Sequence, residues 1–146
     1  MKLRLVFLGK TRSREIRALM EDYRSRIAHF TSVELVEWKS TDGGARVLAD
    51  ARGKDSNAPV VLLDPAGKEF TSEEFARWLA KQMNTGRRAL VFLLGGAEGF
   101  EEETRRRADV LLSLSRMTLP HELARVVLLE QLYRAFALLR EHPYPR

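Results

Sequence analysis

The sequence predicts an α/β fold with a mostly parallel sheet flanked by helices. Short apolar segments alternate along the chain with longer segments of helical periodicity, which is the pattern of successive βαβ units. Two of the apolar segments, residues 59–64 and 89–94, lack the polar alternation of a half-exposed strand, so we expect them to be covered on both faces. The sequence shows no internal repeat, and its 146 residues suit a single domain over residues 1–146.

Five strands are expected. The first alternates apolar and polar side chains and stops at Gly9, which is typical of a strand followed by a turn. The strands are expected at residues 2–8, 33–38, 59–64, 89–94 and 110–113.

Helices are expected between these strands. The clearest helix start is FTSEEF at residues 70–75, where Thr71 and Glu74 have the spacing of a capping box and the two phenylalanines that of a hydrophobic staple. Residues 41–58 are polar and carry glycines, so they predict no more than a short helix. The expected helices run from Thr11 or Ser13 to Phe30, near residues 45–51, from Thr71 to Gly86, over residues 101–107, and from Pro120 to the tail.

The helix expected at residues 101–107, EEETRRR, combines three glutamates with three arginines. Each Glu stands four residues before an Arg, and the acidic residues occupy the first turn, where they complement the helix dipole. We therefore expect three ion pairs on a solvated helix and not a nucleic-acid-binding patch.

The last helix is apolar on nearly every side. Such a helix needs cover on both faces, and in a small protein a second subunit is a natural source of that cover, so we expect a homodimer. One apolar stripe consists of Leu128, Leu132, Ala135 and Leu139, and the apolar residues away from it are Val126, Val127, Tyr133 and Leu138.

Composition limits the possible functional classes. The 45% hydrophobic and 31% charged residues indicate a globular protein, and no apolar run approaches the ~18 residues of a membrane span. The start of the chain lacks the pattern of a secretory signal. Cysteine is absent, which excludes disulfides and thiolate metal sites and fits a cytoplasmic protein.

The net charge of +5 favours a polyanionic partner such as nucleic acid.

Spacing excludes two familiar kinds of site. Gly9-Lys10-Thr11 after a strand resembles the end of a phosphate-binding loop, but that loop needs a glycine where this chain has Arg4. Lys10 and Arg12 are therefore either isolated phosphate contacts or solvated side chains. The three histidines are too widely separated to predict a metal site, and we expect none.

The carboxyl ends of two expected strands have the features of a ligand site. Residues 95–99, GGAEG, follow one strand, and the loop at residues 114–119 follows the next. Open α/β sheets bind flat ligands such as nucleosides where strands end in glycine-bearing loops. The glycines lack the dinucleotide-binding spacing, so this segment is either part of a cofactor site or only a tight turn.

Three motifs together resemble one protein family. They are LLDPAGK at residues 62–68, FLLGGAEGF at residues 92–100 and LSLSRMTLPHELARVVLLEQLYRAF at residues 112–136. The chain resembles the ribosomal RNA large subunit methyltransferase H family of the SPOUT class, the YbeA-like proteins, over nearly its full length. The resemblance implies a SPOUT-type parallel sheet flanked by helices with a C-terminal trefoil knot, a homodimer, and S-adenosylmethionine as cofactor with S-adenosylhomocysteine as product.

The cofactor positions of that family correspond to three segments of this chain. Their apolar side chains suit an adenine ring, and glycine at position 95 would let the main chain approach the ligand. The implied cofactor-binding residues are Leu63, Gly95, Leu114, Ser115, Arg116, Met117, Thr118 and Leu119.

The implied reaction is methylation of N3 of pseudouridine 1915, in helix 69 of 23S rRNA, on the assembled ribosome. The nitrogen must lose its proton for the transfer to occur. Arg134, His142 and Tyr144 are the expected catalytic residues. Tails in the family usually end in a Tyr-His pair, whereas Pro145 follows Tyr144 here, so His142 is the histidine left for such a role.

Two alternative functions stay open from the sequence. One is a catalytically idle module that keeps the fold and binds RNA or the ribosome. The other is a methyltransferase with a different RNA target, such as tRNA, against which the long motif at residues 112–136 argues.

Overall fold

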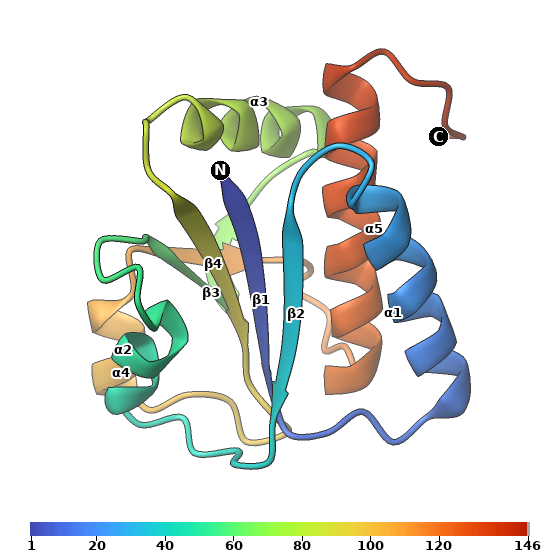
Figure 1. Cartoon of the computed structure of the whole chain (residues 1–146). Helices are drawn as coiled ribbons and strands as arrows, with labels where there is room; N and C mark the ends of the chain where they lie inside the picture. Colours follow the sequence, from blue (N-terminus) through green and yellow to red (C-terminus); the bar gives the residue numbers. More distant parts are fainter. Residues whose placement is uncertain (146) are drawn as a thin grey trace.

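The computed structural model describes residues 1–145, in which five strands form one parallel sheet (Figure 1). The strand order is β2-β1-β4-β3-β5, and each pair of neighbouring strands is parallel, as predicted. The strands are β1 (Lys2–Leu8), β2 (Val33–Trp38), β3 (Val60–Glu69), β4 (Ala89–Leu94) and β5 (Val110–Ser113). The helices are α1 (Arg14–Ile27), α2 (Arg46–Arg52), α3 (Ser72–Met83), α4 (Glu102–Arg107) and α5 (His121–Leu139).

Helices cover both faces of the sheet. One face packs against α1, α3 and α5, and the other packs against α2, with α4 beside it (Figure 1). Strand β1 contributes side chains to the hydrophobic cores on both faces of the sheet. Leu3, Leu5 and Phe7 belong to the first core, on the face covered by α1, α3 and α5. Its remaining apolar residues, Val6 and Leu8, belong to the second. All six residues of β4 are buried, which confirms the expectation of a strand covered on both faces.

Side-chain caps begin two of the helices as the sequence predicts. The Ser13 hydroxyl accepts a hydrogen bond from the Ile16 backbone N–H at 3.2 Å, so Ser13 caps α1. At α3, the Thr71 hydroxyl accepts from the Glu74 N–H at 3.1 Å, and the Glu74 carboxylate accepts from the Thr71 N–H at 2.7 Å. These reciprocal bonds form the expected capping box.

Two predicted helix ends lie too far along the chain. Helix α1 ends at Ile27 and not at Phe30, although the Phe30 ring still packs on the core. Helix α3 ends at Met83 with Asn84 as its C-cap. Gly86 has a φ of 79° but lies in the turn before β4, because a left-handed glycine serves that turn as readily as a helix end.

Strand β3 continues five residues beyond the expected end at residue 64. The expected end was that of the apolar run at residues 59–64, and the next residue, Pro65, has no N–H to donate to a ladder. In the structure the chain bulges and rejoins β5, so that Leu63 and Lys68 both pair with Leu112. A Cβ on Gly67 would stand 2.6 Å from a backbone carbon of β5, so the strands approach this closely only because residue 67 is glycine.

The ion pairs on α4 differ from the predicted pattern. Of the three expected pairs at i,i+4 spacing, only that between Glu103 and Arg107 forms, at 2.9 Å. Glu101 is the N-cap and lies outside the helix, so the other two arginines pair three residues back, with Glu102 and Glu103. The helix is solvated and its arginines are paired, but the predicted spacing of the pairs was wrong.

Helix α5 receives much of its cover within the chain itself. It packs against α1, α3 and the sheet, and its Phe136 ring stacks on Phe30 with the centroids 5.7 Å apart. Its exposed apolar side chains are Leu123 and Leu139, near the two ends. The chain thus supplies cover that we expected from a second subunit, and the homodimer stays a prediction.

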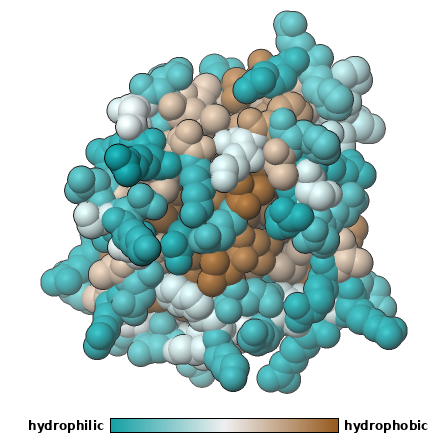
Figure 2. Space-filling view, viewed as in Figure 1, coloured by the Kyte–Doolittle hydropathy of each residue, from teal (hydrophilic) through white to brown (hydrophobic). Residues whose placement is uncertain are grey.

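The face in Figure 2 is mostly hydrophilic, with an apolar patch near its centre over the edge strand β2. All six residues of β2 are half-buried, and two of them are the glutamates Glu34 and Glu37. Charged side chains on an edge strand oppose pairing with another chain.

Within residues 1–145, no helix has the length and apolar character needed to span a membrane.

Candidate cofactor-binding site

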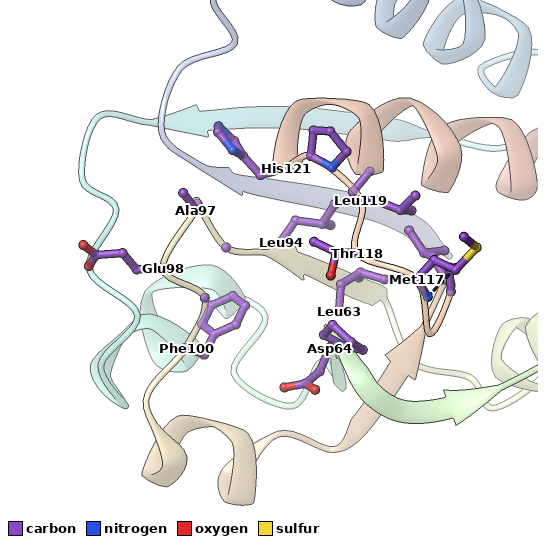
Figure 3. A pocket seen from close by; sticks show the side chains of 18 residues that line it. Leu63, Asp64, Leu94, Ala97, Glu98, Phe100, Met117, Thr118, Leu119 and His121 are labelled. Atoms are coloured by element: carbon purple, nitrogen blue, oxygen red, sulfur yellow. Dashed lines mark hydrogen bonds between the residues drawn. The ribbon is translucent and has the colours of Figure 1, made fainter.

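A cavity of about 450 Å³ opens at the carboxyl edge of the sheet (Figure 3). It is bounded by residues 63–65 of β3, residues 94–100 after β4, and most of the connection from β5 into α5. In an open α/β sheet, this edge is where ligands bind, and the volume lies within the ~300–1,000 Å³ of small-molecule sites.

The walls of the cavity are mainly apolar. Leu63 and Leu94 come from neighbouring strands, and Leu119 comes from the connection into α5, yet all three lie together at the centre of Figure 3. Phe100 lies on the side formed by the loop after β4. Flat apolar walls of this kind suit an aromatic ring such as a nucleobase.

Glycine at position 95 lets this loop pack tightly beside the cavity. A Cβ there would stand 3.1 Å from the Phe100 ring and 3.2 Å from the Gly99 Cα. Both contacts are closer than ordinary van der Waals distance, so a side chain at 95 would displace the Phe100 ring.

Few charged groups reach the cavity. Asp64 lines it, and its carboxylate accepts a 2.5 Å bond from Arg105 of α4 and a 2.8 Å bond from the Ala66 N–H. The hydrogen bond with Asp64 raises the pKa of Arg105, so the guanidinium keeps its charge. Glu98 and His121 are the other titratable residues of the lining.

Seven of the eight predicted cofactor residues line this one cavity. They come from three loops that lie far apart in the sequence. Arg116 is the exception, because its side chain is exposed and pairs with Glu69 at 2.7 Å, outside the lining. The residues lining the cavity are Leu63, Gly95, Leu114, Ser115, Met117, Thr118 and Leu119.

A buried cation that the sequence did not predict lies beside this site. Arg125, in the second turn of α5, has no exposed surface. Its guanidinium donates to the Leu8 carbonyl at 2.8 Å and to the Thr11 hydroxyl at 2.8 Å, and lies 3.2 Å from the Glu37 carboxylate. Burial lowers the pKa of Arg125, and Glu37 opposes that effect. The available signal was an arginine among the apolar positions of a helix.

The three predicted catalytic residues lie at the other end of α5. Arg134 donates to Glu130 at 2.7 Å and to the Pro145 carbonyl at 2.7 Å, and lies over the Tyr144 ring. The Tyr144 hydroxyl donates to Glu130 at 2.9 Å and lies 3.2 Å from the Tyr23 hydroxyl. Burial, together with these two hydrogen-bond partners, raises the pKa of Tyr144.

These residues do not meet the cavity of their own chain. Arg134 stands 13 positions after His121, which lines the cavity, and that spacing corresponds to about 20 Å along a helix. His142 is exposed, and its ring lies 6.0 Å from the Phe30 ring. The structure thus brings Arg134 and Tyr144 together but places the cluster far from the cavity.

Comparison with known proteins decides the family. A family model described as "Predicted SPOUT methyltransferase" matches residues 1–145. The chain belongs to the SPOUT methyltransferase family. The resemblance inferred from the three motifs is thereby confirmed.

Several curated relatives of this SPOUT chain carry the name "Ribosomal RNA large subunit methyltransferase H". The protein of Koribacter versatilis is 43% identical and covers 99% of this chain and 97% of its own length. That of Solibacter usitatus is 43% identical over the whole of both chains. That of Christiangramia forsetii is 40% identical over 99% of this chain and 98% of its own length.

A solved structure shows the same fold. It is that of a probable methylase family protein from Haemophilus influenzae, with a TM-score of 0.54 at 13% identity. It covers 99% of this SPOUT chain and 72% of the other. The parallel sheet flanked by helices is therefore confirmed as the SPOUT fold, and the trefoil knot stays a prediction.

Proposed function

We propose that this SPOUT methyltransferase transfers a methyl group from S-adenosylmethionine to 23S rRNA, at N3 of pseudouridine 1915 in helix 69. The observation that carries the proposal is identity of about 40% over essentially the full length to several proteins named ribosomal RNA large subunit methyltransferase H. The cavity adds support because its size and its apolar walls suit a nucleoside.

The residues around the cavity fit S-adenosylmethionine. Leu63, Leu94 and Leu119 would enclose the adenine, and the main chain at Gly95 would face its polar edge. When bound, the cofactor supplies a methyl group on a positively charged sulfur. The lining carboxylates, Asp64 and Glu98, are compatible with that charge.

The proton on N3 needs an acceptor, and the tail residues differ in their ability to provide one. Tyr144 has a raised pKa and donates its own proton to Glu130, so it is a poor base. Arg134 is a permanent cation, suited to holding a nucleobase or a phosphate. His142 carries an imidazole, the side chain that most often serves as a general base, and it is exposed. His142 is therefore the proposed acceptor.

In the proposed enzyme, the tail of one subunit serves the cavity of the other. Support comes from the separation of about 20 Å between the two regions within one chain. Further support comes from the large exposed apolar side chains of the described residues, which lie on α1, α5 and the loop between β5 and α5. They are Leu19, Met117, Leu123 and Leu139.

The test is transfer of labelled methyl groups to ribosomes from a bacterial strain that lacks this modification. We expect incorporation at one nucleotide of helix 69, located by mass mapping, and little transfer to protein-free 23S rRNA. Transfer to tRNA in its place would favour the alternative RNA target. Calorimetric binding of S-adenosylmethionine without any transfer would favour the idle module.

A further inference from the structure

Three cations lie at the carboxyl edge of the sheet, after the neighbouring strands β1 and β2. Lys10 follows β1, Arg12 follows in the same connection, and Lys39 follows β2. All three residues are exposed, and none of them forms an ion pair with any residue in the range 1–145. We call Lys10, Arg12 and Lys39 the rim cations.

The register of the sheet brings the rim cations together. In the parallel ladder of β1 and β2, Leu8 pairs with Trp38, and the Gly9 N–H donates to the Trp38 carbonyl at 2.7 Å. Lys39 therefore comes one residue, and Lys10 two residues, after paired positions of adjacent strands.

The rim cations also adjoin the cofactor cavity. A Cβ on Gly9 would stand 3.2 Å from the Thr41 methyl group, and a Cβ on Gly96, which lines the cavity, would stand 3.3 Å from the same group. The connection after β1 and the loop after β4 thus meet at one side chain. A nucleotide entering the cavity would pass close to this part of the edge.

The connection that carries Lys10 and Arg12 is firmly held. The Glu122 carboxylate, at the start of α5, accepts hydrogen bonds from the N–H groups of Arg12 and Ser13, both at 3.0 Å. The buried Arg125 donates to the hydroxyl of Thr11, the residue between Lys10 and Arg12. A charged group on a fixed backbone loses less conformational freedom on binding than one on a mobile loop.

Some cations elsewhere are neutralised by neighbours, whereas the exposed Lys54, Lys81 and Arg88 form no ion pair within residues 1–145, so the rim cations are distinguished by their place at the carboxyl edge and not by lacking a partner. On α1, Arg24 pairs with Glu21 and Arg26 pairs with Asp22. The arginines of α4 are paired in the same way.

Near the rim cations, the Glu37 carboxylate accepts hydrogen bonds from Thr11 and Arg125, and that of Glu122 from the Arg12 and Ser13 N–H groups. Glu15 and Asp42 are exposed carboxylates in the same region.

We propose that the rim cations bind backbone phosphates of the RNA that flank the nucleotide held at the cavity. This inference rests on the proposed function and adds to it the surface that holds the substrate. Each Lys or Arg that neutralises a phosphate contributes about 0.7–0.9 to the slope of log affinity against log salt.

The test compares two triple variants with equal change in charge. The rim variant is Lys10→Gln, Arg12→Gln and Lys39→Gln. The control variant is Lys54→Gln, Lys81→Gln and Arg88→Gln, whose residues are exposed and lie in α3 or in the connections that precede β3 and β4, at the amino edge. Binding of labelled protein to large ribosomal subunits and to protein-free 23S rRNA is measured by cosedimentation from 50 to 300 mM KCl.

We expect the rim variant to lower the salt slope by about 2 to 3 on both ligands and to weaken binding roughly tenfold or more at 150 mM KCl. The control should change the slope by less than about 1, and both variants should bind S-adenosylhomocysteine as the wild type does. Equal slopes for the two variants would overturn the proposal. An effect on subunits but none on protein-free rRNA would point to a ribosomal protein and would also overturn it.

These outcomes separate this inference from the proposed function. If the wild type methylates ribosomes while the rim and control variants show equal slopes, the rim assignment fails and the function stands. If the wild type methylates no RNA, the function fails, and the slopes still decide whether the rim cations bind phosphate.

Discussion

Gly95 is the residue at which the cavity wall is most sensitive to a side chain. Because a Cβ at this position would already stand 3.1 Å from the Phe100 ring, the larger group in Gly95→Val would displace that ring, which lines the cavity. We expect S-adenosylhomocysteine to bind at least tenfold more weakly, a loss of about 1.4 kcal/mol or more. Isothermal titration calorimetry measures the effect.

A stability control separates a local effect from unfolding. The Tm of Gly95→Val should stay within about 4 °C of the wild type, because the loop after β4 lies at the edge of the sheet. Unchanged affinity in the folded variant would show that this wall does not contact the cofactor.

Arg125 is the residue on which the junction of α5 with the sheet depends. Arg125→Met would leave Glu37, whose side chain is 11% exposed, without its buried partner and the Leu8 carbonyl without its donor. Breaking a buried ion pair on one side costs about 3–5 kcal/mol, so we expect a loss of at least about 3 kcal/mol in the free energy of unfolding. Urea denaturation measures it.

A double variant tests the cause of that loss. Arg125→Met with Glu37→Met removes both charges, and such apolar replacements of whole pairs are often tolerated. The double variant should therefore be more stable than Arg125→Met alone. The double variant could instead be less stable than the wild type by the sum of the losses in Arg125→Met and Glu37→Met. In that case the two side chains contribute independently, and the loss in Arg125→Met does not come from breaking a buried pair.

At the residue scale, the sequence identified the loops of the site better than the side chains that support them. Seven of the eight positions transferred from the family line the cavity, because the glycine and loop motifs lie in continuous segments. Arg125 and its partners come from β1, β2 and α5, and local patterns carry no information on such long-range contacts. Arg116 follows the motif in sequence but points away from the cavity towards Glu69.

At the element scale, Glu122 links the start of α5 to the connection between β1 and α1. Hydrogen bonds from the N–H groups of Arg12 and Ser13 lower the pKa of Glu122 in the folded protein. A group with a lowered folded pKa contributes stability above its unfolded pKa of about 4.3, and this contribution is lost as the pH falls through the folded value. Glu122→Gln should therefore lower stability by about 1 kcal/mol at pH 7 and by progressively less below about pH 4.

Thermal unfolding of both proteins from pH 7 to pH 3 measures this convergence. Glu141→Gln, at an exposed position in the tail, is the control, and its Tm should follow the wild type throughout. A Tm difference for Glu122→Gln that stays constant down to pH 3 would contradict the role of the carboxylate charge.

Elements defined by local signals were predicted well, and elements defined by pairing were not. The capping box of α3 and the alternation of β1 are local, and both elements begin where the sequence predicts. The second half of β3 exists because the chain bulges past Pro65 and rejoins β5. Since that pairing depends on a strand more than 40 residues away, the apolar run at residues 59–64 gave the wrong end.

At the scale of the whole molecule, one edge of the sheet collects the groups that the proposed reaction needs. The cofactor cavity, the rim cations and the start of α5 all lie at the carboxyl edge, because parallel strands release their connections there. The sequence predicted the parallel sheet but not the strand order, which depends on contacts between segments far apart. The tail cluster around Arg134 lies at the opposite end of α5, and only a second subunit would bring it to this edge.

Mixed dimers test whether the proposed active site is shared between subunits. Gly95→Val impairs the cavity and Arg134→Ala impairs the tail, so each homodimer should show little methyl transfer. In a mixed dimer, the intact cavity of the Arg134→Ala chain meets the intact tail of the Gly95→Val chain and forms one working site. Random assembly makes about half of the dimers mixed, so coexpression should restore about a quarter of the wild-type activity.

Isolation of mixed dimers through two different affinity tags sharpens the comparison, because each should then carry about half of the wild-type activity. If cavity and tail worked within one chain, both chains of the mixed dimer would be defective and transfer would stay at the level of the homodimers. That result would exclude the shared site. It would also require the tail to move about 20 Å toward the cavity of its own chain, since that is the separation along α5.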